Sequence, residues 1–136
     1  MSIKNYSKES KLLATWGLIT TLIVILDQWV KYWIVLNLSL YEKININFFI
    51  NITHQQNTGA AFSILADAGG WQRWFLSVLA ILVCGYIIHW LYQLRTTSQW
   101  YLSYGLSFVL GGALGNVIDR IRLGYVVDYA QVLING

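Results

Sequence analysis

The residues best suited to chemistry lie late in the chain, where a glycine-rich stretch leads into Asn116, Asp119 and Arg120 and a second carboxylate, Asp128, follows. Asn116 and Arg120 are four residues apart and would share one face of a helix. Three apolar residues precede Asp128, so we expect dry surroundings that raise its pKa and let it hold or take a proton near neutral pH. The alternative is a set of surface charges beyond the end of a helix.

Two earlier groups could support such a site. Asp27 and Lys31 interrupt an apolar run and are four residues apart, so they can pair on one helix face. They either brace a polar cavity between helices or extend to the membrane interface from the end of a helix. Asn57 and Gly59 open the stretch Asn-Thr-Gly-Ala-Ala-Phe-Ser. This stretch is either a loop or a place where Asn57 hydrogen-bonds a substrate backbone.

Other reactive residue types lack partners in the sequence. His54 and His89 show no metal-ligand spacing, and we interpret them as a loop residue and an interfacial helix residue. Cys84 is the only cysteine and lies inside an apolar run, where a small packing residue is expected instead of a nucleophile. We therefore expect neither a metal nor a cofactor.

The composition indicates a membrane protein. Of the 136 residues, 57% are hydrophobic and 11% charged, against about 45–50% and about 25% in soluble domains. Seven Trp and nine Tyr suit a bilayer interface. The net charge of +3 favours contact with anionic lipid over nucleic acid, because the chain has no dense run of Lys and Arg.

Three charge-poor runs predict three transmembrane helices, at residues 12–36, 74–94 and 96–118. Gly111 and Gly115 would let helix backbones approach closely in lipid. Residues 44–53 alternate between apolar and mostly polar side chains, which predicts one half-buried strand. A lone strand cannot cross lipid, so this strand must lie outside the hydrocarbon.

The spans also predict a topology. The N-terminus and the turn at Arg95 fall on one side of the membrane, and the strand and residues 119–128 fall on the other. The lysines at positions 4, 8 and 11 favour an N-terminus inside the cell. A cleavable signal peptide is not expected, because the first apolar run leads into Asp27 and Lys31 instead of small residues.

At these residues the sequence resembles the lipoprotein signal peptidases, also called signal peptidase II. That family carries an Asp and a Lys four apart in its first helix, and then a motif like Asn-x-Gly-Ala-Ala-Phe-Ser, here residues 57–63. It also carries Gly-Gly-Ala-x-Gly-Asn-x-x-Asp-Arg and Gly-x-Val-Val-Asp-Phe, matched by residues 111–120 and 124–129 with Tyr129 in place of Phe.

The resemblance implies an all-α membrane protein with four transmembrane helices and a small extramembrane β-cradle. It implies an aspartic endopeptidase that needs no metal and cleaves diacylglyceryl-modified prolipoproteins before the lipidated Cys, on the outer face of the bacterial inner membrane. Asp128 would be one of two catalytic aspartates. Substrate binding and support would come from Asn57, Gly59, Asn116, Asp119 and Arg120, and Asp27 and Lys31 would brace the helices.

The family's second catalytic aspartate lies in a motif like Phe-Asn-x-Ala-Asp before the fourth helix, and residues 1–136 hold no such motif. We therefore expect a single domain over residues 1–136 that is truncated at its C-terminus. An alternative is a catalytically inactive homologue that only binds substrate or is a non-functional remnant. A small transporter is a weaker alternative, because the charged residues cluster at one side and do not line a path across the membrane.

Overall fold

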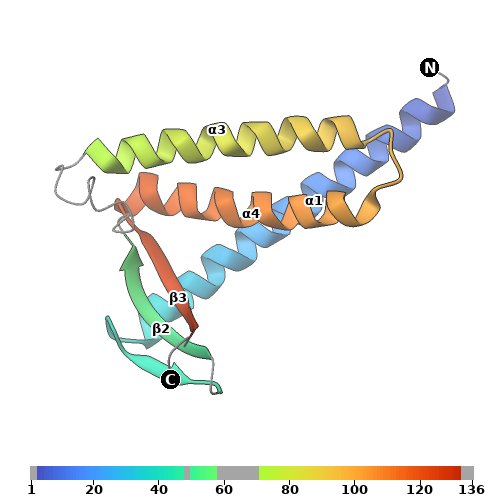
Figure 1. Cartoon of the computed structure of the whole chain (residues 1–136). Coiled ribbons are helices and arrows are strands. Elements are labelled where there is room, and N and C mark those ends of the chain that lie inside the picture. Colours follow the sequence, from blue (N-terminus) through green and yellow to red (C-terminus); the bar gives the residue numbers. More distant parts are fainter. Residues whose placement is uncertain (1–2, 48–49, 58–70, 133–136) are drawn as a thin grey trace. The chain divides into compact units, whose positions relative to one another are not determined.

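The computed structural model describes residues 3–47, 50–57 and 71–132. It contains three long helices, α1 (Ile3–Asn37), α3 (Trp71–Leu94) and α4 (Trp100–Leu123). Three strands accompany them, β1 (Lys43–Asn45), β2 (Ile50–Asn57) and β3 (Val126–Val132) (Figure 1). Each helix has a stretch long and apolar enough to cross a membrane, at Asn5–Asn37, Arg73–Leu94 and Trp100–Leu123. The prediction of three spans is confirmed.

All three helices extend beyond their predicted bounds. α3 begins at Trp71 instead of residue 74, and α4 begins at Trp100 instead of residue 96 but ends later than predicted. α1 begins at Ile3, well before residue 12, because the polar segment that precedes the apolar run contains good helix formers such as Lys8, Glu9 and Lys11. α4 continues past Ile118 to Leu123 and carries Arg120 and Arg122 in its last turn, where cations complement the helix dipole. A count of uncharged residues detects the part of a helix that crosses lipid and misses its polar ends.

Contacts divide the chain into two units. The helical unit comprises Met1–Asp27 and Val78–Gly115, and the sheet unit comprises Gln28–Ser77 and Asn116–Gly136. The sequence-based expectation of a single domain stays a prediction.

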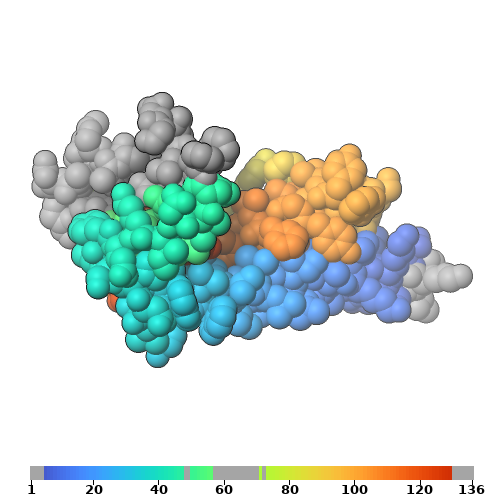
Figure 2. All heavy atoms as spheres, turned by 90° about the horizontal axis from the view of Figure 1, so that it is seen from below, coloured from blue at the N-terminus to red at the C-terminus, as the bar shows by residue number. Residues whose placement is uncertain are grey.

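In the helical unit, small residues let α1 and α4 pack closely. A Cβ atom added to Gly111 would lie 2.6 Å from Ile23 side-chain atoms and 2.9 Å from the carbonyl oxygen of Thr20. The Thr20 hydroxyl donates to the carbonyl oxygen of Ser107 at 3.2 Å. Figure 2 shows this part of α1, in blue, lying along α4, in orange. The close approach predicted from Gly111 is therefore present.

The apolar core of the helical unit combines residues of all three helices. The buried members are Trp16, Cys84, Ile87, Leu91, Leu94, Leu106 and Leu110. Cys84 is a packing residue of this core, as its apolar sequence context predicts.

The sheet unit contains an antiparallel sheet in the order β1-β2-β3. The prediction of one strand over residues 44–53 is wrong, because this segment is a hairpin in which Lys43 pairs with Thr53 and Asn45 with Asn51. The side-chain oxygen of Asn47 accepts a hydrogen bond from the Ile50 N–H at 2.9 Å, which favours a turn between the strands. The two-residue alternation continues through that turn, so the pattern alone cannot show where the chain reverses.

Two sequence interpretations are corrected in this unit. His54 is a buried residue of β2, where its Nδ1 lies 3.0 Å from the carbonyl oxygen of Leu38, and it is not a loop residue. The sequence analysis gave residues 119–128 only a side of the membrane and no secondary structure, whereas this segment completes α4 and then begins β3. Gly124 separates the two elements with a φ of 89°, a conformation that glycine adopts without strain at the end of a helix.

Candidate functional site

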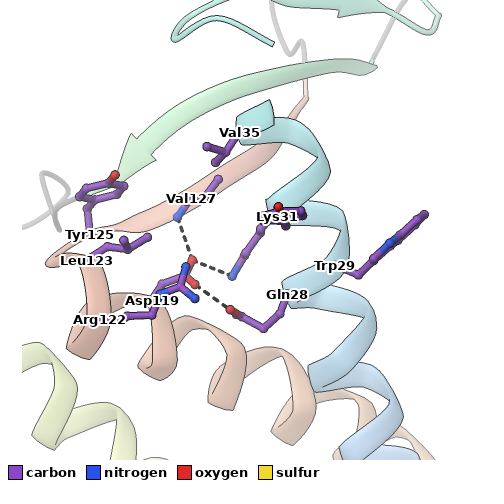
Figure 3. Close-up of a pocket in the computed structure, with 10 residues that line it drawn as sticks. Gln28, Trp29, Lys31, Val35, Asp119, Arg122, Leu123, Tyr125 and Val127 are labelled. Carbon is purple, nitrogen blue, oxygen red and sulfur yellow. Dashed lines mark hydrogen bonds and ion pairs between the residues drawn. The ribbon is translucent and has the colours of Figure 1, made fainter. Parts of the chain in front are cut away.

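A cluster of polar side chains surrounds Asp119, which lies near the end of α4. Only 1% of the surface of Asp119 is exposed. Its Oδ2 lies 3.1 Å from the Lys31 Nζ, and its Oδ1 accepts a hydrogen bond from Gln28 Nε2 at 3.1 Å. The same Oδ2 accepts the backbone N–H of Val127 at 3.0 Å. Figure 3 shows these three donors reaching Asp119 from α1 and from β3. One carboxylate thus joins two membrane-crossing helices to the strand that follows α4.

Lys31 lies on α1 and is 4% exposed. In addition to the ion pair with Asp119, its Nζ donates to Asn116 Oδ1 at 2.8 Å. Asn116 and Asp119 are three residues apart and therefore present both oxygens from one face of α4. A buried ammonium is costly unless it is paired and hydrogen-bonded, and these contacts supply both requirements.

The sequence suggested Asp27 as the partner of Lys31, and that pairing stays a prediction. Within the sheet unit, Lys31 pairs with Asp119, which is remote along the chain. In the helical unit, a Cβ atom added to Gly115 would overlap the Asp27 carboxylate. Gly115 is therefore the residue that makes room for this acid beside α4.

Asp128 lies on β3, opposite Gln55 of β2, and is half-buried, so its surroundings are less enclosed than the flanking apolar residues predict. The residue before it, Val127, is buried and has its N–H held by Asp119. Asp119 thus fixes the backbone directly before Asp128. The sequence places these two acids near each other along the chain, but it does not show that Asp119 hydrogen-bonds the backbone of the strand that carries Asp128.

Arg73 of α3, which the sequence analysis did not identify, stabilises the C-terminal end of α4, just before β3. Its Nε donates to the carbonyl oxygen of Arg120 at 2.7 Å, and a second guanidinium nitrogen donates to the carbonyl oxygen of Ile121. Carbonyls in the last turn of a helix have no partner within the helix, so Arg73 satisfies acceptors that would otherwise need water. In the sequence, Arg73 is only a cation at the start of an apolar span. Such a cation more often marks the membrane boundary than a residue that caps another helix.

The remaining predicted site residues are Arg120, Asn57 and Gly59. Arg120 has a buried Nε with no hydrogen-bond partner among the described residues. A buried donor of this kind is rare and indicates a place for an acceptor. The backbone of Asn57 pairs with Val126 in the sheet, whereas Gly59 lies outside the described residues. Within the part of the chain that the structure describes, no group of three His, Cys, Asp or Glu side chains could hold a metal ion.

A cavity of about 390 Å³ lies beside the cluster. The described residues that line it are Gln28, Trp29, Lys31, Tyr32, Val35, Asp119, Arg122, Leu123, Tyr125 and Val127. Asp128 is not one of them, so this cavity is better described as the surroundings of the Lys31–Asp119 pair than as a cleft around the candidate catalytic acid.

Comparison with known proteins places this arrangement among membrane peptidases. A family model described as signal peptidase (SPase) II matches residues 19–136. The lipoprotein signal peptidase of Alteromonas mediterranea is 46% identical over 128 residues, which cover 94% of this chain and 69% of that protein. The lipoprotein signal peptidase of Aeromonas hydrophila is 47% identical over 115 residues, which cover 84% of this chain and 68% of that protein.

A solved structure has a similar fold. A bacterial membrane enzyme determined by the in meso method at 1.9 Å resolution superposes with a TM-score of 0.72 at 29% sequence identity. The match covers 90% of this chain and 77% of that one. The helices and the small sheet are therefore a known arrangement.

Proposed function

Because the chain belongs to the signal peptidase II family, we propose that it takes part in removing the signal peptide from diacylglyceryl-modified prolipoproteins, cut before the lipidated Cys, with Asp128 as a catalytic acid. The observation that carries this proposal is the hydrogen bond from the Val127 N–H to Asp119, which fixes the backbone next to Asp128. The names of the relatives supply the substrate class.

The proposed chemistry needs two carboxylates in different protonation states. The ionised one takes a proton from water as the water oxygen attacks the scissile carbonyl, and the protonated one hydrogen-bonds the carbonyl oxygen. The C–N bond then breaks, and the leaving amine takes a proton from a carboxyl group. Asp128 supplies one carboxylate.

Asp119 is a positioning residue in this proposal and not the second acid. Its two oxygens already face Lys31, Gln28 and the Val127 N–H. An acid that exchanged protons during each turnover would disturb all three contacts. In this proposal the second carboxylate is that of the family motif Phe-Asn-x-Ala-Asp, which residues 1–136 do not contain.

Substrate binding is assigned to Asn57, Gly59, Asn116 and Arg120. The buried Nε of Arg120 offers a donor to a substrate carbonyl. The Asn116 side-chain oxygen faces Lys31, which leaves its amide NH₂ as the group to face substrate. Asp27 and Lys31 act as bracing residues.

We place the protein in the bacterial inner membrane with Asp128 on the outer side. The ion pair between Arg95 and Glu9, with 3.8 Å from the Arg95 Nε to the carboxylate, supports a common side for the N-terminal segment and the 95–99 turn. Topology reporters fused after Gln56 and after Gly124 should both read outside, and one fused near Thr97 should read inside. Opposite signals at the first two positions would contradict this orientation.

The decisive experiment compares three samples with a diacylglyceryl-modified prolipoprotein on a gel. The samples are residues 1–136, the same chain followed by the C-terminal segment of the Alteromonas mediterranea relative (the extended chain), and the extended chain carrying Asp128→Asn. We expect cleavage only by the second sample, with substrate binding retained by the third.

Two other outcomes are informative. Robust cleavage by residues 1–136 alone would show that Asp119 or a partner chain supplies the second carboxylate. Binding without cleavage by all three samples would favour the inactive homologue and contradict the proposal.

A further inference from the structure

A polar hollow of about 340 Å³ lies at the end of the helical unit, where the start of α1 meets the turn between α3 and α4. It is lined by Asn5, Lys8, Glu9, Arg95, Thr96 and Thr97. The uncharged run of α1 starts at Leu12, one turn after Lys8, and a helix rises about 5.4 Å per turn. The hollow therefore sits next to the hydrocarbon boundary, at the depth of lipid headgroups.

The charge of the hollow is positive. Its lining holds the two cations Lys8 and Arg95 against one carboxylate, Glu9. Arg95 is held in place, because it lies 3.8 Å from Glu9, donates to the carbonyl oxygen of Tyr92 at 2.6 Å and sits 3.7 Å from the centre of the Tyr92 ring. Glu9 thus offsets the charge of Arg95, and Lys8 supplies the net positive charge.

Exposed aromatic rings surround this end of the unit. Tyr6, Trp100 and Tyr101 are each about two-thirds exposed. The rings of Trp100 and Tyr101 meet edge to face with centroids 5.8 Å apart. Exposed Trp and Tyr at the end of a membrane-crossing helix are typical of the headgroup layer, where an amphipathic ring is stable.

We propose that this hollow binds the phosphate group of an anionic glycerophospholipid. The Lys8 ammonium would pair with a phosphate oxygen, and Thr96 lines the same space. The Thr97 hydroxyl also lies there, but it already donates to the carbonyl oxygen of Leu94 at 2.9 Å. The ring face of Tyr92 is occupied by Arg95, so the rings left for the glycerol and upper acyl region are Tyr6, Trp100 and Tyr101. The proposal does not depend on peptidase activity.

A general attraction between a basic segment and an acidic membrane is the competing explanation, and α1 offers a matched control for it. Lys8 and Lys11 are both exposed cations on the same helix end, but only Lys8 lines the hollow. A specific site distinguishes the two lysines, whereas a diffuse surface potential treats them alike.

The test is native mass spectrometry of residues 1–136 released from detergent containing either phosphatidylglycerol or phosphatidylcholine. We expect retention of phosphatidylglycerol over phosphatidylcholine and a loss of affinity of about five-fold in Lys8→Gln, as expected for one cation near a lipid surface. Lys11→Gln should change affinity by less than about two-fold. Because Lys8 is exposed, its replacement leaves the fold testable by circular dichroism.

Equal losses in Lys8→Gln and Lys11→Gln would overturn the site in favour of diffuse attraction. Displacement of the bound lipid by millimolar inorganic phosphate would also overturn it, because the hollow would then recognise a free anion. Equal retention of the two lipids would contradict the charge argument.

Discussion

The two units differ in the polar groups that they bury, because the buried charges Lys31 and Asp119 both lie in the sheet unit. In the helical unit, the buried hydroxyls donate to backbone carbonyls, as Ser107 does to Ser103 at 2.8 Å and Thr20 does to Ser107 at 3.2 Å. In the sheet unit, buried charges bond to one another and to the strand before Asp128. A hydroxyl can be removed at small cost because the carbonyl keeps its helical partner. A charge cannot, because its partner is then buried alone.

The largest effect should come from Lys31→Met. Removing one member of a buried ion pair costs about 3–5 kcal/mol, because the Asp119 carboxylate keeps its burial and loses its counter-charge. The double replacement Lys31→Met with Asp119→Leu should recover part of this loss. Unfolding of all variants in detergent, analysed as a double-mutant cycle, measures the coupling.

The matched change in the helical unit is Ser107→Ala, which should cost about 1 kcal/mol. A coupling energy near zero between Lys31 and Asp119, or a loss in Ser107→Ala as large as that in Lys31→Met, would remove the distinction between the units.

Gly111→Ala tests whether the close packing of α1 against α4 stabilises the helical unit. The new methyl group would meet Ile23 and the Thr20 carbonyl oxygen, so we expect a loss of stability of about 1–3 kcal/mol. Gly112 is the control, since a Cβ atom there meets nothing within 4 Å. Gly112→Ala should be neutral or stabilising by up to about 1 kcal/mol, because alanine favours a helix. Similar thermal unfolding of the two variants would contradict the packing argument.

A smaller effect is expected from Arg73→Lys in the sheet unit. The positive charge remains, but a lysine lacks the fork that reaches the carbonyl oxygens of Arg120 and Ile121 together. We expect a loss of about 1 kcal/mol in stability and slower cleavage by the extended chain. Arg122→Lys, in the same last turn of α4, serves as the control. Unchanged unfolding and cleavage in Arg73→Lys would mean that the end of α4 before Asp128 does not need the hydrogen bonds from Arg73.

The smallest effect is expected from Cys84→Ala. Cys84 is buried in the apolar core of the helical unit, so its replacement should cost about 1 kcal/mol or less and leave cleavage by the extended chain unchanged. Loss of cleavage in a variant that still folds would show that the helical unit contributes chemistry as well as packing.

The sequence predicts the helical unit better than the sheet unit. Spans follow from local composition, because every residue in lipid must itself be apolar or find a partner nearby. The four-residue spacing of Gly111 and Gly115 also predicts their role in close helix packing. The hairpin was missed because its alternation runs through the turn near Asn47, and β3 was missed because it is short and follows a helix directly.

The sequence selected some residues of the candidate site but neither Gln28 nor Arg73, and it did not predict the contacts. Asp119, Asn116 and Asp128 could be selected from type and spacing. Their partners could not, because Gln28 and Asp119 are 91 positions apart and Lys31 and Asn116 are 85 apart. Local spacing predicts pairs within one helix, as it does for Asp27 and Lys31, and cannot predict pairs between helices.

The central claim is that Asp119 positions the strand and Asp128 carries the chemistry. It is tested most directly by measuring two quantities, cleavage rate and amide hydrogen exchange over residues 124–130, in the extended chain with Asp119→Asn or Asp128→Asn. Asp128→Asn should abolish cleavage and leave the exchange of this segment unchanged. Asp119→Asn should reduce cleavage and also speed exchange at the Val127 amide, because its acceptor is weakened. Faster exchange in Asp128→Asn, or loss of cleavage in Asp119→Asn with no change in exchange, would contradict the account.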